Sequence, residues 1–288
     1  MPIKLTHVSH VYMPGTPFES TALEDINLTL DEGEFIGLIG HTGSGKSTLV
    51  QHINGLLMPT GGSINVFGVE LTEKGADLKR VRRDVGLVFQ YPEHQLFEET
   101  VEADVAFGPK NMGLSGDELN ECVRHAIARV GLDFDAVHDR SPFELSGGQK
   151  RRVAIAGVIA MRPKFLILDE PTAGLDPRGR NDLLNLVRRI HDEDGAGILM
   201  ITHSMDDIAR VAQRVVVIDR GKIQMDDTPR AVFSHADELV KMGLDVPQTS
   251  RLRMALAARG VSMPNDVFTL EEATDFLMTL VREGNGHA

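Results

Sequence analysis

The chain of 288 residues contains no tryptophan and only one cysteine, Cys122. A single cysteine cannot close a disulfide within the chain, which excludes a disulfide-stapled fold and favours a reducing compartment. Cys122 is also a poor candidate for a catalytic thiol, because the helix-like stretch around it, residues 117–130, carries no motif.

A long apolar run is also missing. The longest one, residues 153–161, is about half of the ~18 apolar residues that a membrane-spanning helix needs. The first residues carry no apolar signal region. We therefore expect the chain to be cytosolic by itself and to reach a membrane only through a partner.

Basic residues are fewer than acidic ones, with 30 Lys and Arg against 42 Asp and Glu, so the formal net charge is −12. An acidic chain is poorly suited to broad nucleic-acid binding, and no nucleic-acid partner is expected. The length allows one large core with a small appendage.

The most informative segment that is present is Gly-His-Thr-Gly-Ser-Gly-Lys-Ser at residues 40–47. It fits the phosphate-loop pattern, and it lies between an apolar, strand-like run and a helix-like stretch, as that motif requires. Glycines let backbone N–H groups surround a triphosphate, and the helix N-terminus favours an anion. Lys46 should reach the β- and γ-phosphates, and Ser47 should bind Mg²⁺. The residues expected to bind nucleotide here are Gly40, His41, Thr42, Gly43, Ser44, Gly45, Lys46, Ser47 and Thr48.

A second motif is the apolar run at 165–168 that ends in Asp169 and Glu170. Ligands bind at the carboxyl ends of parallel strands, which places these carboxylates beside the phosphate loop. Asp169 is expected to hold Mg²⁺, and Glu170 to polarise the attacking water.

A third motif, Ser146-Gly147-Gly148-Gln149, opens a predicted helix over 146–161. Its backbone donors again favour an anion. Because one lysine-containing loop binds one nucleotide, we expect this second element to grip a nucleotide that another subunit holds.

Strands alternating with helices predict an α/β fold with a mostly parallel sheet covered on both faces, preceded by N-terminal antiparallel strands. The last clear strand is predicted at 215–219, and Ser204 with Asp207 predicts a capping box. A helical subdomain is expected at about 91–162, within a domain spanning 1–235. Short helices fill the predicted appendix, 236–288, where Thr269 with Glu272 predicts a further capping box and Leu270, Ala273, Leu277, Leu280 and Val281 share one face.

The order and spacing of the three motifs resemble the nucleotide-binding subunit of an ABC (ATP-binding cassette) transporter over about residues 3–235. This resemblance implies the P-loop ATPase fold of that family and a head-to-tail dimer. Two ATP molecules would lie between the phosphate loop of one subunit and the Ser-Gly-Gly-Gln signature of the other. The resemblance also assigns adenine stacking to Tyr12, Mg²⁺ and γ-phosphate sensing to Gln90, the loop that crosses the dimer to Asp176, and the γ-phosphate switch to His203. An ordinary strand-end tyrosine remains the alternative for Tyr12.

A narrower resemblance is to the ATPases of energy-coupling-factor (ECF) importers of vitamins and metal ions. Residues 90–97, 101–112 and 152–157 and the helical tail carry it, and residues 12–19 are similar to the second, A-prime, ATPase paralogue. It implies a heterodimer with a paralogous ATPase, although a homodimer stays possible, a transmembrane coupling (T) subunit and a substrate-binding membrane (S) subunit. The chain would then be peripheral, at the cytoplasmic face of the cell membrane.

Such ATPases grip their coupling helices with residues 91–109. The apolar side chains available for that socket are Tyr91, Leu96, Phe97, Val101 and Phe107. For Val101 and Phe107 we favour a position in the core of the helical subdomain.

Two other functions keep the same fold. A soluble ABC ATPase acting on DNA or ribosomes is disfavoured by the single signature and by the lack of sustained heptads. A conventional ABC importer for amino acids or metals is closer, and residues 91–109 and the tail disfavour it without excluding it. The cargo cannot be inferred from the sequence, because no residue of this chain is expected to touch it.

Overall fold

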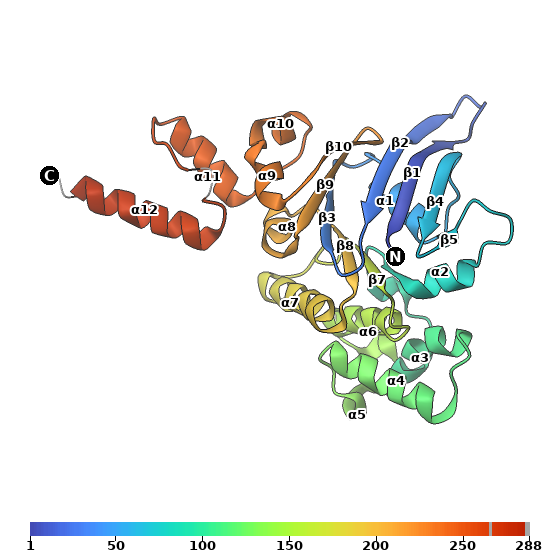
Figure 1. Ribbon diagram of the computed structural model, residues 1–288. Helices are drawn as coiled ribbons and strands as arrows, with labels where there is room; N and C mark the ends of the chain where they lie inside the picture. The colour runs from blue at the N-terminus through green and yellow to red at the C-terminus, as the bar shows by residue number, and fades with distance from the viewer. Residues whose placement is uncertain (265–266, 286–288) are drawn as a thin grey trace.

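The computed structural model describes residues 1–264 and 267–285; the last three residues of the predicted appendix lie outside them. Two sheets and a set of helices make up the chain (Figure 1). The first sheet is antiparallel, in the order β2-β1-β4-β5. Its strands are β1 (Ile3–Tyr12), β2 (Ser20–Leu30), β4 (Gly61–Val66) and β5 (Val69–Glu70).

The second sheet has the order β10-β9-β3-β8-β7-β6. Its strands are parallel except for the edge strand β10, as the predicted α/β fold requires. The strands are β3 (Phe35–Ile39), β6 (Val85–Val88), β7 (Phe165–Asp169), β8 (Gly197–Ile201), β9 (Arg214–Asp219) and β10 (Lys222–Asp227).

β10 is a further strand beyond residues 215–219, the last clear strand predicted from the sequence. Arg220 and Gly221 both have positive φ and turn the chain tightly from β9 into β10. The strand reads Lys-Ile-Gln-Met-Asp-Asp and is mostly exposed, so it presents no apolar run. An edge strand of this kind carries little sequence signal.

The parallel sheet is buried on both faces. Leu166 and Leu168 of β7 join the core that the sheet forms with the helices below it, whereas Phe165 and Ile167 join the core between the two sheets. The second core also contains α1 (Lys46–Ile53). This period-two alternation explains why the strand is apolar throughout.

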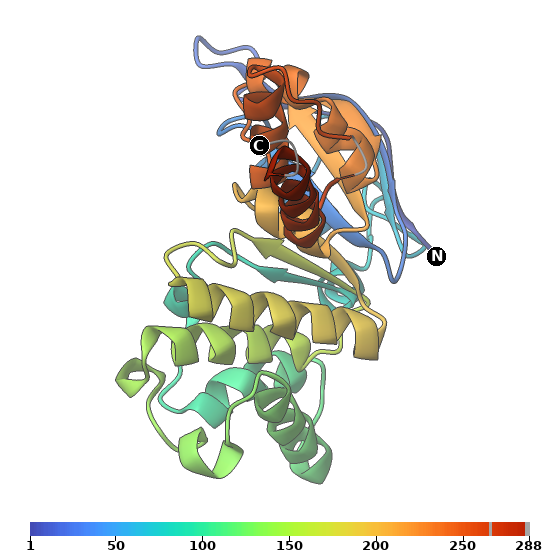
Figure 2. The same ribbon diagram turned by 90° about the vertical axis from the view of Figure 1, so that its left-hand side faces the viewer.

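The helical part lies below the sheet in Figure 1, and in Figure 2 the strands, α7 and α6 follow one another downward. α6 packs against α3, α4 and β6, so the helical part is joined directly to the sheet edge. Its elements are the 3-10 helix η1 (Pro92–Gln95), α3 (Val101–Asn111), α4 (Gly116–Arg129), α5 (Phe134–Val137), the 3-10 helix η2 (Pro142–Glu144) and α6 (Gly147–Ile159).

The remaining core helices are α2 (Leu78–Asp84), α7 (Pro177–Asp194) and α8 (Met205–Val211). Asp176 caps α7 by accepting from the Gly179 N–H at 2.7 Å. At α8 only half of the predicted capping box forms. Ser204 accepts from the Asp207 N–H, but the Asp207 carboxylate binds Arg180 instead of reaching back.

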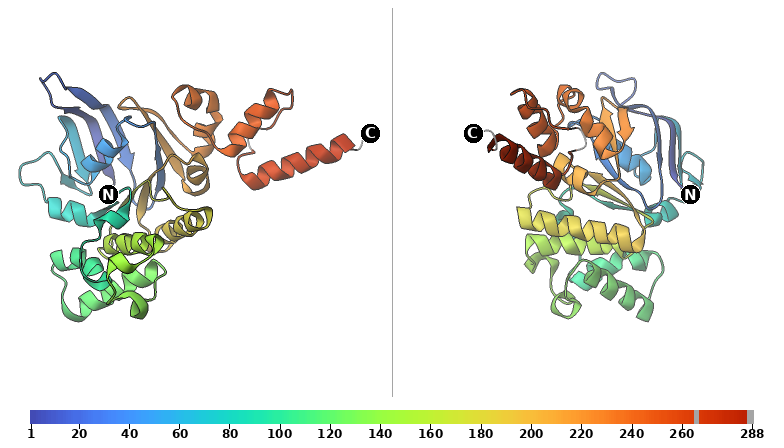
Figure 3. Two further views of the ribbon diagram at one scale, coloured as in Figure 1. Left: turned by 180° about the vertical axis from the view of Figure 1, so that it is seen from behind. Right: turned by 60° about the vertical axis from the view of Figure 1, so that its left-hand side comes forward.

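The C-terminal helices are α9 (Pro229–Ser234), α10 (Ala236–Lys241), α11 (Gln248–Ala257) and α12 (Leu270–Asn285). The predicted capping box at α12 is confirmed, because Thr269 and Glu272 exchange hydrogen bonds of 2.7 and 3.2 Å. α12 projects away from the rest of the chain (Figures 1 and 3). The predicted shared face is therefore covered only in part: Ala273 is buried, whereas Leu270 and Val281 are exposed. Within the described ranges, no helix combines the length and the apolar character that crossing a membrane demands.

Candidate functional site

The phosphate loop joins β3 to α1, as the motif predicts. Gly43 and Gly45 have φ of 82° and 108°, which favours glycine. A Cβ on Gly40 would lie 2.3 Å from the Ile218 carbonyl oxygen, and one on Gly45 would lie 2.5 Å from that of Ala22. The loop therefore keeps its shape only with glycine at these positions.

Lys46 is buried inside this loop. Its Nζ donates to the carbonyl oxygens of Gly40 and His41 at 2.7 and 2.9 Å. Burial lowers the pKa of Lys46, while the negative charges of Glu170 and Asp169 act in the opposite direction. The loop lysine and the two strand-end carboxylates thus share one electrostatic site.

The carboxylates of Asp169 and Glu170 differ from ordinary surface acids in their burial and in their raised pKa values. Burial raises the pKa of Asp169 against the charges of Lys46 and His203, and it raises the pKa of Glu170 as well. Glu170 also has a φ of 49°, a left-handed conformation that costs a residue with a Cβ roughly 1–2 kcal/mol. Backbone strain and a raised pKa are both typical of functional carboxylates, and a raised pKa suits a general base.

His203 and Gln90 come to the same edge of the sheet. The carboxyl ends of β3, β8, β7 and β6 are neighbours in that order, with Asp169 opposite Ile201 and Leu168 opposite Val88. His203 follows β8, and its Nε2 lies 3.3 Å from Glu170 Oε1. Gln90 follows β6, and its side chain is exposed beside this edge.

Tyr12, at the end of β1, is connected to the phosphate-loop helix. Its hydroxyl lies 3.1 Å from Thr48 Oγ1, so one of the two hydroxyls donates to the other. The residue is 40% exposed, which leaves part of the ring free for stacking. Tyr12 and Thr48 are therefore brought together, although they are 36 residues apart.

The signature lies at the N-terminus of α6. Ser146 and Gln149 form a reciprocal capping box. Ser146, Gly148 and Gln149 line a cavity of about 310 Å³ together with Asp176, so the signature and the loop before α7 share one surface.

No neighbouring atom within the chain requires glycine at the two signature positions. A Cβ on Gly147 or Gly148 would meet nothing within 4 Å, and neither residue has positive φ. Both glycines lie in the first turn of α6, directly after its N-cap Ser146, where alanine would fit without a clash. Packing within the chain therefore gives no reason for glycine here, whereas close approach of another molecule does.

The signature and the phosphate loop are on separate parts of the chain. α6 packs against α3, α4 and β6, whereas α1 packs against β2 and β4. Among the described residues, no hydrogen bond or ion pair joins residues 146–149 to residues 40–48. The structure thus brings together the loop, the carboxylates, Gln90 and His203, and it keeps the signature elsewhere.

Arg151 is a functional candidate that sequence reasoning missed. It is 5% exposed and holds two segments together. Its guanidinium donates twice to the Glu93 carboxylate at 3.2 Å, and once each to the carbonyl oxygens of Pro171 and Ala173 at 3.1 and 2.9 Å. It thereby connects the segment after Gln90 to the loop after Glu170. In the sequence Arg151 is only one of two arginines that follow the signature, and nothing in the pattern marks it as buried.

Residues 91–109 divide between surface and core. Tyr91, Phe97 and Phe107 are 44%, 59% and 45% exposed, and the rings of Phe97 and Phe107 pack edge to face at 4.9 Å. Leu96 and Val101 are buried. The prediction of a core position is confirmed for Val101 and wrong for Phe107, because α3 turns that side chain to its outer face.

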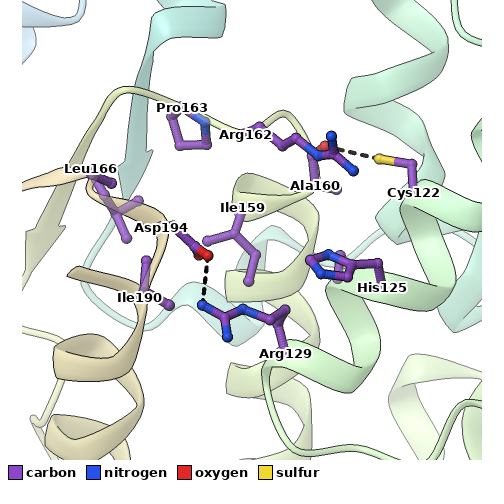
Figure 4. Close-up of a pocket in the computed structure, with 12 residues that line it drawn as sticks. Cys122, His125, Arg129, Ile159, Ala160, Arg162, Pro163, Leu166, Ile190 and Asp194 are labelled. Carbon is purple, nitrogen blue, oxygen red and sulfur yellow. Dashed lines mark hydrogen bonds and ion pairs between the residues drawn. The ribbon is translucent and has the colours of Figure 1, made fainter. Parts of the chain in front are cut away.

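A further cavity, of about 420 Å³, lies between the helical part and the sheet (Figure 4). Arg129 of α4 closes one side by pairing with Asp194 of α7 at 2.7 Å. Cys122 lines the cavity, donates its S–H to the Ala160 carbonyl at 3.0 Å, and has a pKa raised by burial. The thiol is thus kept protonated, which agrees with the expectation that it is not a nucleophile.

Comparison with known proteins gives the following matches. A family model described as ABC transporter matches residues 23–173. The energy-coupling factor transporter ATP-binding protein EcfA2 of Caldanaerobacter subterraneus is 55% identical over 282 residues, which is 98% of each chain. The protein of that name in Clostridium perfringens is 52% identical over 99% of this chain and 100% of its own length.

Solved structures agree with these matches. cbiO1 from Clostridium perfringens, described as part of the ABC transporter complex cbiONQ, superposes with a TM-score of 0.73 and 38% identity, over 87% of this chain and 97% of that one. The ATP-binding cassette MJ0796, a dimer bound to ADP and Pi, gives a TM-score of 0.70 and 30% identity, over 79% and 98%.

Proposed function

Because this chain belongs to the ABC transporter family and is the ATP-hydrolysing subunit of an energy-coupling-factor importer, we propose that it works as one half of a dimer that ATP closes. One observation supports the dimer above all others. The chain has two glycine-containing helix N-termini, which favour anions, on separate elements, and no neighbouring atom within the chain accounts for the glycines of the second. A nucleotide bound at the phosphate loop of a companion subunit would approach these glycines closely and account for them.

The companion is a paralogous ATPase, and the two chains form the heterodimer that the A-prime resemblance implies. Each of two ATP molecules then lies between residues 40–48 of one subunit and the signature of the other. The relatives that carry the EcfA2 name match over nearly their whole length, which supports the assignment of this chain to one side of such a pair.

The dimer is attached to the membrane through a transmembrane coupling subunit, the T component, and a separate S component binds the vitamin or metal-ion cargo. This places the chain at the cytoplasmic face of the cell membrane as a peripheral protein. The exposed rings of Tyr91, Phe97 and Phe107 are a suitable surface for the coupling helices. Residues 1–235 form the ATPase domain in this arrangement, with residues 91–162 as its helical subdomain and 236–288 as an appendix.

The nucleotide site fits ATP with Mg²⁺. Ser47, Asp169 and Gln90 supply a hydroxyl, a carboxylate and an amide oxygen, the hard oxygen donors that Mg²⁺ prefers. Within the part of the chain that the structure describes, no cluster of three His, Cys, Asp or Glu side chains exists that could hold a metal alone. When bound, Mg²⁺ neutralises charge on the β- and γ-phosphate oxygens.

The residues of the chain divide the chemistry between them. Tyr12 stacks on the adenine, and Lys46 with the loop N–H groups binds the β- and γ-phosphates. Glu170, with its raised pKa, accepts a proton from the attacking water, while His203 orients toward the γ-phosphate beside it. Loss of the γ-phosphate removes its contacts with both subunits, and the dimer opens.

The test is the substitution Glu170→Gln in the full-length chain, assayed with its partner ATPase. Loss of a general base lowers the turnover rate by ~10²–10⁴-fold, while ATP affinity is retained because the phosphate loop is untouched. Size-exclusion chromatography with ATP should then show a trapped dimer. Glu73→Gln, an exposed acid in a surface loop, is the matched control and should hydrolyse ATP normally.

Wild-type turnover in Glu170→Gln would refute the role of Glu170. The substitution Lys46→Ala provides an independent check, since it should weaken ATP binding itself. Unchanged affinity in that variant would contradict the phosphate-loop assignment.

A further inference from the structure

Three aromatic rings form a cluster between β1 and α1. The buried ring of His10 lies between those of Tyr12 and His52. The ring centroids of His10 and Tyr12 are 4.5 Å apart at 74°, and those of His10 and His52 are 4.8 Å apart at 61°. Both contacts are edge-to-face, the geometry that aromatic pairs favour.

His52 is a fixed support for this cluster. It is fully buried on α1, and its Nδ1 lies 2.8 Å from the Leu57 carbonyl, to which it donates. Burial lowers the pKa of His52, so the ring stays neutral. Thr48, which binds the Tyr12 hydroxyl, precedes His52 by four residues and lies on the same face of the helix.

Tyr12 is therefore attached to the phosphate-loop helix at two points. Its hydroxyl contacts Thr48 directly, and its ring contacts His52 through His10. Two attachments fix both the position and the tilt of a ring, whereas the hydroxyl contact alone leaves the ring free to rotate. Fixing a side chain before the ligand arrives lowers the entropy cost of binding.

The His10 ring contributes by packing. Its Nδ1 is buried without a hydrogen-bond partner among the described residues. Leaving a buried polar atom unpaired is unfavourable, so this nitrogen gives no reason for histidine at the position. The edge-to-face contact with Tyr12 gives a reason for a ring at this position.

We propose that His10 is a positioning residue for nucleobase recognition: it holds the Tyr12 ring against α1 in the orientation that stacks on adenine. The inference rests on the proposed role of Tyr12. It predicts an effect on the binding of the base and none on the binding of the phosphates or on the chemical step.

A matched pair of variants tests this. His10→Leu removes the ring but keeps an apolar side chain of similar volume, and His10→Phe keeps a ring. In ATP hydrolysis by the full-length chain with its partner ATPase, His10→Leu should raise KM for ATP about 2- to 10-fold, the range expected for the loss of an aromatic pair. kcat should stay unchanged, and His10→Phe should restore the wild-type KM.

Two further measurements separate positioning from a general structural role. Inorganic tripolyphosphate carries no base, so its inhibition constant should be the same in His10→Leu and wild type. In a Tyr12→Ala background, His10→Leu should add nothing to KM, because the two residues act through one contact. Thermal melting of each variant confirms that it is folded.

The outcomes are distinct. Additive effects of the two substitutions, or weaker tripolyphosphate inhibition in His10→Leu, would overturn the positioning role while leaving Tyr12 in place. An unchanged KM in Tyr12→Ala would overturn both this inference and the adenine contact on which it rests.

Discussion

Replacement of Arg151 by methionine should destabilise the chain more than any loss of a surface ion pair. The arginine side chain is 6% exposed and the Glu93 side chain 21% exposed. Methionine fills much of the space of the arginine stem but leaves the Glu93 carboxylate and two backbone carbonyls without their donor. Breaking a buried ion pair from one side costs about 3–5 kcal/mol. Water reaches Glu93 in part, so we expect a loss of about 2–4 kcal/mol.

Urea unfolding of the full-length chain measures this loss as a lower midpoint at an unchanged slope. Arg188→Met is the matched control. Its guanidinium lies 3.7 Å from Asp192 one helical turn away, and the two side chains are 62% and 57% exposed. Such a surface pair contributes only about 0.3–0.5 kcal/mol.

The pH dependence gives a second readout. Burial acts to raise the pKa of Glu93, but the hydrogen bond and charge of Arg151 outweigh it, and the net pKa is lowered. A lowered pKa in the folded state contributes stability above the ordinary value of about 4.3, which is lost as the pH falls toward the folded value. The difference between wild type and Arg151→Met should therefore hold from pH 7 to about pH 5 and shrink as the pH falls below about 4.3, toward the lowered pKa of Glu93. A loss no larger than that of Arg188→Met, or a difference that does not change with pH, would refute this reasoning.

Two shorter predictions concern the loop and the thiol. His41 Nε2 lies 2.8 Å from Asp219 Oδ1, and its Nδ1 lies 2.7 Å from the Thr42 carbonyl within the loop. Asp219→Ala should release His41 from β9 and weaken ATP binding about 3- to 10-fold, while Asp219→Asn keeps a partner and most of the affinity. Equal ATP affinities of wild type and Asp219→Ala in calorimetric titration would show that this contact does not support the loop. Cys122 is buried with a raised pKa, so a disulfide-exchange reagent should label it at least about 100-fold more slowly in the native chain than in urea. Prompt labelling of the native chain would show that the cavity beside Cys122 opens freely.

The parts that were predictable from the sequence are those encoded in adjacent residues. The phosphate loop between β3 and α1, the carboxylates at the end of β7 and the capping box at the start of α12 all follow from local patterns. β10 could not be predicted because an exposed edge strand needs no apolar run. The core position predicted for Phe107 is wrong because the presence of an apolar residue in a helix does not show which face of the helix it occupies.

The contacts that could not be predicted join residues far apart in the chain. Glu93 and Arg151 are separated by 58 residues, and each is an ordinary charged residue in its own segment. His10 and His52 likewise become partners only when β1 lies beside α1. Such pairs depend on the register and packing of whole elements, which no local pattern encodes.

The open space around Gly147 and Gly148 bears on how variants of this protein should be selected. Alanine at either position meets no neighbour and should leave the isolated chain at least as stable, since alanine is the better helix former. A screen for yield or thermal tolerance of the isolated subunit would therefore retain substitutions that, in the proposed dimer, crowd the nucleotide held by the companion subunit. Selection for stability of the isolated subunit would then work against the activity of the assembled dimer.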